Sequence, residues 1–284
     1  MTGSYLTCCA RTDVGMRRSS NEDAFLLIDL DAPTSRIACT GEPIDVGARR
    51  MLLAVSDGMG GAAAGEVASS LALATLARAL QVPSDQPLDR QLEAAVQAAN
   101  SSVLEAAVQR GQHGMGATLT AIVIANNTAW IAEVGDSRAY LLRGGSLRQL
   151  TRDQSYVQML VDIGAIDEEA ARQSTRRNVI LQAVGTQPRL QVALGRLDLR
   201  RGDRLLLCSD GLSNEIEDAE LATLLSSQTP AVACEHAVAR ANEHGGKDNV
   251  TVIVAVVEGD AVPLSPPNET ITGTHRVIQD YKGT

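Results

Sequence analysis

The chain has 284 residues, of which 44% are apolar, and a formal net charge of -9, so it is long enough and apolar enough to fold as a globular enzyme with a real core. Only 2% of the residues are aromatic, and this scarcity and the negative charge together argue against the stacking platforms and basic faces of nucleic-acid binders. No stretch reaches about 18 consecutive apolar residues, and residues 1–10 lack the pattern of a secretion signal, so we expect a cytoplasmic protein that does not enter a membrane.

Short apolar runs bounded by turn residues predict the strands. In chain order they span residues 5–10, 24–30, 51–55, 117–125, 128–134, 139–142, 191–197, 204–208 and 250–257. Asn126 and Asn127 join two of these runs at hairpin distance, and residues 143–145 lead from another run into a further strand at 146–150. Such consecutive pairing predicts antiparallel sheets.

Helices are predicted between the third and fourth strands and near the end of the chain. Residues 65–80 and 92–108 carry apolar side chains at spacings of three and four, and residues 230–243 begin with a proline suited to a first helical turn. Strands in two blocks with helices between and after them predict an α+β fold with a sheet-on-sheet core flanked by helices. Between residues 153 and 189 we expect a small surface subdomain, and the polar residues 258–284 predict a mobile tail.

The cysteines give no sign of a metal site. Five are present, Cys8, Cys9, Cys39, Cys208 and Cys234, and no two have C-x-x-C spacing. An odd number without such a pattern predicts reduced, packed thiols and no disulfide.

Acidic residues stand where the predicted strands begin or end. Asp57 and Asp210 each follow an apolar run within the same tripeptide, Ser-Asp-Gly. Similar junctions hold further acids, which are Glu22, Asp23, Asp136 and Asp248. Taken singly, an Asp beside a Gly is an ordinary turn residue, but so many at strand edges predict one convergent site.

Converging carboxylates call for cations, because two of them about 4 Å apart repel by roughly 4 kcal/mol at an effective dielectric constant near 20. No cluster of His or Cys accompanies the acids, so the expected ions are Mg²⁺ or Mn²⁺. Several acids sharing ions suggest a metal pair that holds a water for in-line attack on phosphorus. Of the adjacent Arg17 and Arg18, one suits bidentate contact with a phosphate and the other is expected to be solvated.

Seven motifs in a fixed order resemble one protein family. They are Thr12-Asp13-x-Gly15-x-x-Arg18-x-x-Asn21-Glu22-Asp23, Val55-Ser56-Asp57-Gly58-Met59-Gly60-Gly61, Gly116-Ala117-Thr118, Val134-Gly135-Asp136-Ser137-Arg138, Leu150-Thr151-x-Asp153-Gln154-Ser155, Ser209-Asp210-Gly211-Leu212 and Asp248-Asn249-x-Thr251. Over residues 5–257 the chain resembles the metal-dependent serine/threonine protein phosphatases of the PPM (protein phosphatase 2C-like) family, in its short bacterial form. The resemblance implies a four-layer α-β-β-α sandwich of two mainly antiparallel sheets flanked by helix pairs, with a flap at about residues 155–186.

The resemblance also implies a role for each acid. Asp57 would bridge two central ions, one of which also binds the carbonyl of Gly58. Asp210 and Asp248 would bind the other central ion. Two further acids, Glu22 and Asp23, would hold metal-bound waters, and Asp136 would join Asp210 around a weaker third ion. The cofactor would be Mn²⁺ or Mg²⁺.

By the same resemblance, Arg18 binds the substrate phosphate, Arg17 is solvated, and Asn249 supports Asp248. The implied reaction is hydrolysis of phosphoserine or phosphothreonine in phosphorylated proteins, by direct attack of a metal-bridging water or hydroxide. A monomer that opposes a bacterial serine/threonine kinase in signal transduction is the expected biological setting. Ser56 and Ser209 are not expected to be nucleophiles, because no motif places a His beside either.

One departure and three alternatives remain. Met59 stands where many eukaryotic members have a His suited to protonate the leaving group, and Met cannot donate a proton, so we expect Asp136 and its ion to take part in that step. A non-catalytic signalling module with the same fold is the first alternative. It would be favoured by loss of Asp57, Asp210 or Asp248, all of which are present. A structural metal protein or a nuclease-like hydrolase is disfavoured by the acidic composition.

Overall fold

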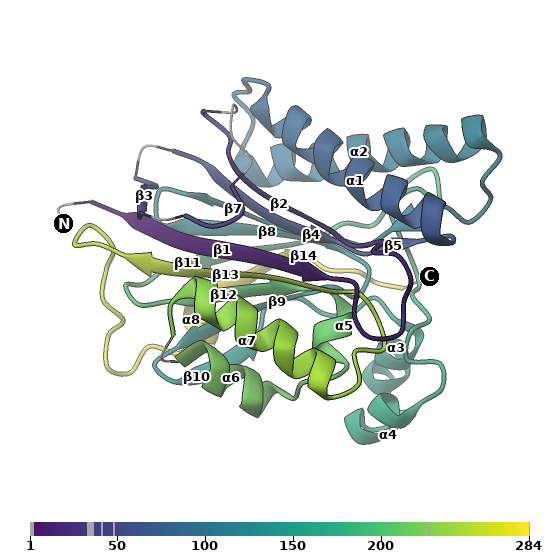
Figure 1. The fold of residues 1–284 in the computed structure, drawn as a ribbon. Helices are drawn as coiled ribbons and strands as arrows, with labels where there is room; N and C mark the ends of the chain where they lie inside the picture. The colour runs from purple at the N-terminus through teal and green to yellow at the C-terminus, as the bar shows by residue number, and fades with distance from the viewer. Residues whose placement is uncertain (1–2, 33–36, 41, 48, 227, 284) are drawn as a thin grey trace.

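Two six-stranded antiparallel sheets pack face to face in the computed structural model, which describes residues 3–32, 37–40, 42–47, 49–226 and 228–283 (Figure 1). One sheet has the strand order β10 (Ser146–Gln149), β9 (Arg138–Arg143), β12 (Arg204–Cys208), β13 (Val250–Glu258), β1 (Tyr5–Asp13) and β3 (Ile44–Asp45). The other has the order β14 (His275–Gln279), β11 (Ala193–Asp198), β8 (Thr128–Val134), β7 (Leu119–Ala125), β4 (Met51–Ser56) and β2 (Ala24–Asp29).

Helices cover the outer face of each sheet (Figure 1). On one side lie α1 (Ala62–Gln81) and α2 (Leu88–Arg110), and on the other lie α7 (Pro230–Glu243), α6 (Asp218–Ser226) and the one-turn α5 (Asp210–Ser213). Strand β4 explains why the chain builds four layers: Leu52 packs toward α1 and α2, whereas the next residue, Leu53, packs between the sheets. A strand buried on both faces reads as an unbroken apolar run. The predicted fold class is confirmed.

The predicted hairpin between β7 and β8 is also present. Asn126 and Asn127 have φ angles of 49° and 59°, the left-handed conformation of a two-residue hairpin turn, which Asn tolerates better than most residues. Near the opposite end of β7 from this turn, β5 (Gly58–Met59) pairs with β6 (Gly116–Ala117) in a small separate sheet.

A flap with two short helices stands where a surface subdomain was expected. These are α3 (Tyr156–Asp162) and α4 (Glu168–Gln173), each capped by the side chain of the residue before it, Ser155 and Asp167. The two ends of the flap meet in a β-bridge between Ser155 and Ile180, and its exit forms a second bridge between Val184 and Ala117. The flap therefore closes on itself next to β6.

The C-terminal segment differs from the mobile tail that its polar composition predicts. Ile271–Thr274 form the short helix α8, and β14 extends the second sheet by pairing with β11. Within this segment Glu269 binds Arg200 through both carboxylate oxygens, at 2.6 and 2.8 Å. Glu269 and Thr274 thus bind arginines that are distant in the sequence, Arg200 and Arg143, and composition does not reveal these contacts.

The prediction that all five thiols are reduced is wrong for two of them. Cys9 in β1 forms a disulfide with Cys39, while Cys8, Cys208 and Cys234 are buried free thiols. The loop after β2 returns to the edge of β1, where the two cysteines face each other in a β-bridge. Their separation of 30 residues carries no local pattern. None of the helices that the structure describes is long and apolar enough to cross a membrane.

Candidate metal centre

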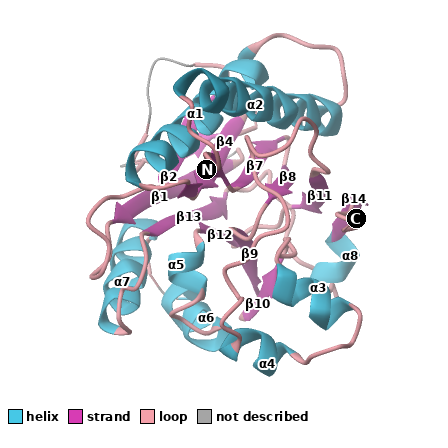
Figure 2. Cartoon of the chain, turned by 90° about the vertical axis from the view of Figure 1, so that its right-hand side faces the viewer, coloured by secondary structure: helices cyan, strands magenta, loops and turns pink. Residues whose placement is uncertain are grey.

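The acids singled out in the sequence come together at one end of the sandwich. They lie in the β1–β2 loop, at the end of β4, in the β8–β9 turn, at the start of α5 and just before β13. This end lies on the right in Figure 1, near β5 and α5, and faces the viewer in Figure 2. Five separate segments of the chain therefore contribute to one cluster of carboxylates.

The proximity of the acids shows in their pKa values. Burial, followed by the charges of Asp23, Asp210, Asp136 and Asp248, raises the pKa of Asp57 well above its ordinary range. Burial raises the pKa of Asp23 to about 7, although hydrogen bonds from Ser209 and Thr251 oppose the shift. Burial and the charge of Asp248 raise the pKa of Asp210 to about 6. Burial and the charge of Asp210 likewise raise the pKa of Asp136 well above its usual value.

The serines next to Asp57 and Asp210 are structural anchors. The Ser56 hydroxyl donates to the carbonyl oxygen of Thr118 at 2.6 Å. The Ser209 hydroxyl donates to Oδ2 of Asp23 at 2.7 Å and accepts from the backbone N–H of Thr251 at 3.0 Å. Both hydroxyls are engaged in holding strands and an acid together, which agrees with the expectation that neither is a nucleophile.

Gly58 occupies a position that no side chain fits. A Cβ built there would lie 2.1 Å from the carbonyl oxygen of Gly65 in α1 and 2.6 Å from that of Glu22. The backbone N–H of Gly58 also donates to the Glu22 carbonyl at 3.2 Å. Glycine therefore brings the end of β4, the start of α1 and the β1–β2 loop together, with Asp57 at their junction.

Arg18 and Asn249 organise the β1–β2 loop around Asp248. Nη2 of Arg18 donates to Oδ2 of Asp248 at 2.7 Å, and this hydrogen bond is the main cause that raises the pKa of Arg18. The Asn249 side chain accepts from the backbone N–H of Glu22 at 2.8 Å and donates to the carbonyls of Val14 and Ser20 at 2.9 Å. Asn249 thus supports mainly the loop that carries Arg18 and touches Asp248 through its backbone N–H. Arg17 is exposed.

The chemistry of this cluster fits a hard cation. Oδ1 of Asp23 and Oδ1 of Asp210 are buried, and neither has a hydrogen-bond partner among the residues described. An unpaired buried carboxylate oxygen is costly unless a cation or a proton meets it. The atoms with which these acids could bind a metal ion are all oxygens, which suits Mg²⁺ or Mn²⁺.

In the structure, the acidic side chains of the cluster are not arranged around one common point. Within the described part of the chain, no three His, Cys, Asp or Glu side chains are placed so that they could hold one ion together. Asp248 illustrates the reason, because its Oδ1 accepts from the N–H of Asn249 at 2.8 Å and its Oδ2 is bound to Arg18. Both carboxylate oxygens of Asp248 are therefore engaged within the protein itself.

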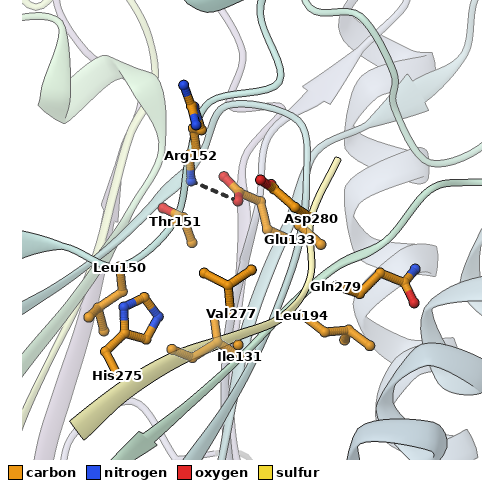
Figure 3. A pocket seen from close by; sticks show the side chains of 12 residues that line it. Ile131, Glu133, Leu150, Thr151, Arg152, Leu194, His275, Val277, Gln279 and Asp280 are labelled. Carbon is orange, nitrogen blue, oxygen red and sulfur yellow. Dashed lines mark hydrogen bonds between the residues drawn. The ribbon is translucent and has the colours of Figure 1, made fainter. Parts of the chain in front are cut away.

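A separate pocket of about 50 Å³ lies next to β8, β11 and β14 and is lined by none of the predicted site residues (Figure 3). Glu133 faces this pocket and is 2% exposed. Its Oε2 accepts from the backbone N–H of Arg152 at 3.0 Å, and its Oε1 has no hydrogen-bond partner among the described residues (Figure 3). Burial raises the pKa of Glu133 well above its usual value. The only signal in the sequence was an acid within the apolar run 128–134.

Replacing Glu133 with Gln is expected to stabilise the protein at pH 8 and to have little effect near pH 4.5. The pKa of Glu133 is raised in the folded protein, so its protonated carboxyl makes its full contribution to stability at pH values below the pKa of the unfolded chain, about 4.3. This contribution is lost as the pH rises. Glutamine has the same shape and does not titrate. Thermal or urea unfolding at both pH values should show a gain of roughly 1–3 kcal/mol at pH 8 only. The exposed Glu105→Gln is the control, and equal stability of Glu133→Gln and the parent protein at pH 8 would contradict the prediction.

Comparison with known proteins gives a consistent result. The model of the family described as Protein phosphatase 2C matches residues 42–244. The chain is 41% identical over 266 residues to the serine/threonine protein phosphatase PstP of Mycobacterium tuberculosis. This match covers 92% of this chain and 47% of PstP. It is 35% identical over 250 residues to the serine/threonine phosphatase Stp of Listeria innocua, covering 86% of this chain and 93% of Stp. The chain thus spans about half the length of PstP and nearly all of Stp.

A solved structure agrees in fold over almost its whole length. The crystal structure of the catalytic domain of PstP in complex with two manganese ions superposes with a TM-score of 0.75 at 38% sequence identity. The match covers 90% of this chain and 99% of that domain.

Proposed function

Because the chain belongs to the protein phosphatase 2C family, we propose that it is a metal-dependent protein phosphatase that hydrolyses phosphoserine and phosphothreonine in proteins. One observation carries the proposal. Asp57, Asp210 and Asp248 are all present, and they lie together with Asp23 and Asp136 in one cluster, in which one buried oxygen of Asp23 and one of Asp210 lack hydrogen-bond partners among the described residues. A phosphatase-fold protein that serves only as a signalling module has no use for so costly a cluster, which disfavours that alternative.

We propose that Asp57, the carbonyl of Gly58, Asp210 and Asp248 hold two central ions, Mn²⁺ or Mg²⁺. The remaining acids serve a weaker third ion and bound water, and they are Asp136, Asp23 and Glu22. The raised pKa values support this assignment. Burial and the neighbouring aspartates make the charged form of these acids unfavourable, and a bound dication would offset that cost. When bound, such ions activate water for attack on phosphorus and neutralise the charge that develops.

The chain's own residues supply binding and orientation. The side chain of Arg18 is 50% exposed and pairs with Asp248, so it can turn from that carboxylate to a phosphate at the mouth of the site. A guanidinium binds two phosphate oxygens at once and thereby orients the phosphorus centre. Release of Arg18 frees Asp248 for an ion, so binding of the ion and of the phosphate support each other. Met59 cannot protonate the leaving group, and we assign Asp136 to positioning the group that does.

The partners follow from the reaction. A phosphatase acting on phosphoserine and phosphothreonine requires phosphorylated proteins, and a serine/threonine kinase must make them. The negative net charge supports the absence of a nucleic-acid partner. The cytoplasmic location, the monomeric state and the role in signal transduction stay predictions from the sequence.

The direct test is hydrolysis of a phosphothreonine peptide by the purified chain with Mn²⁺, with Mg²⁺ and with a chelator in excess. We expect phosphate release with either ion and none above background with the chelator, with recovery when Mn²⁺ is added back. A sulfate-free buffer and a phosphotyrosine peptide of the same sequence serve as controls. Phosphate release that persists in the chelator would overturn the proposed chemistry.

A further inference from the structure

Two buried glutamines at the base of the flap have no role in the proposed chemistry, yet Gln154 contacts the turn that leads to Asp136 and Gln182 contacts Gln154. Gln154 and Gln182 are 1% and 4% exposed. A buried amide is costly unless its donors and acceptors are satisfied, so the partners of these two side chains are informative.

Gln154 holds the residues immediately before Asp136. Its backbone N–H donates to the carbonyl of Gly135 at 2.8 Å, and its side-chain Oε1 accepts from the N–H of Gly135 at 2.9 Å. Its Nε2 donates to the carbonyl of Glu133 at 3.3 Å. Gly135 has a φ of 105°, a backbone conformation that residues with a side chain rarely adopt. The three hydrogen bonds therefore fix the turn whose next residue is Asp136.

Gln182 joins this turn to the far end of the flap. Its Nε2 donates to Oε1 of Gln154 at 2.7 Å and to the carbonyl of Gln191 at 2.7 Å. The backbone N–H of Leu181 also donates to the carbonyl of Gln154 at 2.7 Å. A single side-chain oxygen of Gln154 thus accepts from Gly135 in the site and from Gln182 in the flap.

The exit of the flap reaches the other side of the site. Val184 exchanges two backbone hydrogen bonds with Ala117, at 2.8 and 3.0 Å. Ala117 in β6 pairs with Gly58 in β5. The base of the flap is therefore bonded both to the turn before Asp136 and to β6, the strand that pairs with the one containing Gly58.

From these contacts we propose that Gln154 and Gln182 are positioning residues that set the orientation of Asp136 and couple it to the flap. A shift of the flap on contact with a protein substrate changes the hydrogen bond from Gln182 to Gln154 and, through the shared oxygen, the Gly135 turn. The inference rests on the proposed function for the role of Asp136, but the coupling itself is a property of the metal-free chain.

The experiment compares Gln154→Leu and Gln182→Leu with a matched control, Gln97→Leu. Gln97 in α2 makes a similar pair of hydrogen bonds to the backbone of Leu190 near the flap base, at 2.8 and 3.3 Å, without contact to the Gly135 turn. Leucine nearly preserves the volume of glutamine and removes its donors and acceptors. Urea unfolding first shows which variants are folded.

The first readout is amide hydrogen exchange in the metal-free protein. We expect the Gly135 amide to exchange about tenfold faster in both Gln154→Leu and Gln182→Leu, although the side chain of Gln182 does not touch Gly135. In Gln97→Leu, exchange should rise at Leu190 and stay unchanged at Gly135. Unchanged exchange at Gly135 in Gln182→Leu, or an equal rise in Gln97→Leu, would overturn the coupling. If Gln154→Leu does not fold, Gln182→Leu decides the question.

The second readout is kinetic. On a small aryl phosphate, Gln154→Leu and Gln182→Leu should lower kcat about tenfold with KM within about twofold, since they misplace a group near the reaction and leave phosphate binding intact. A parent chain without activity would defeat the proposed function and leave the exchange result standing. An active parent chain with unchanged kcat in both variants would defeat this inference alone.

Discussion

Replacing Asp57 with alanine is expected to abolish hydrolysis of a phosphothreonine peptide, with a loss of roughly a thousandfold or more in kcat/KM. The carboxyl of Asp57 is the one whose pKa is raised jointly by Asp23, Asp210, Asp136 and Asp248 after burial. It therefore lies within electrostatic reach of every other aspartate of the cluster, which suits the proposed role of Asp57 as a ligand of both central ions. Steady-state kinetics at saturating Mn²⁺ would measure the loss in kcat/KM. Calorimetric titration with Mn²⁺ would measure the loss of bound ions.

The same variant should remain folded. Its metal-free form is expected to be at least as stable as the parent chain at pH 8, because removing one acid from a buried cluster relieves repulsion among the others. Asp85→Ala, in the exposed connection between α1 and α2, is the matched control and should keep full activity. Retention of kcat/KM within tenfold, or an unchanged number of bound Mn²⁺ ions, would rule out the bridging role.

Replacing Arg143 with methionine is expected to cause a large loss of stability, although Arg143 lies outside the site. The Arg143 side chain is 5% exposed and binds the fully buried Asp203 through two hydrogen bonds of 2.6 and 2.7 Å. It also donates to the carbonyl of Asp198 at 3.0 Å and to Oγ1 of Thr274 in α8 at 2.8 Å. Methionine fills much of the space and leaves Asp203 buried without its cation, which costs about 3–5 kcal/mol.

Urea unfolding of the metal-free protein would measure this loss, and limited proteolysis would show whether the C-terminal segment is released together with α8. Arg148→Met, at an exposed position of the neighbouring strand β10, should change stability by less than about 0.5 kcal/mol. Changing both partners, as Arg143→Met with Asp203→Leu, should recover a large part of the loss, because no charge is then buried alone. A loss below about 1 kcal/mol in Arg143→Met would contradict the importance of this ion pair.

Elements with strong periodicity were predictable from the sequence, and those stabilised by distant partners were not. The apolar run of β4 and the apolar face of α2 carry their own signal, since burial dictates their composition. Helix α3 was missed because only Val157 of its seven residues is buried. Strand β14 was missed because its five residues are half-buried or exposed, and pairing with β11 defines it.

By itself, the sequence determined the fold class and the residues of the cluster, because strand-edge acids beside glycines are local features that follow from the alternation of apolar runs and turns. Only the tertiary structure decided how they meet: that Asp248 is paired with Arg18, that Asn249 holds the β1–β2 loop, and that Gln154 joins the Asp136 turn to the flap. These contacts link residues as far as 235 positions apart. Their geometry depends on the packing of two sheets, which no local pattern encodes.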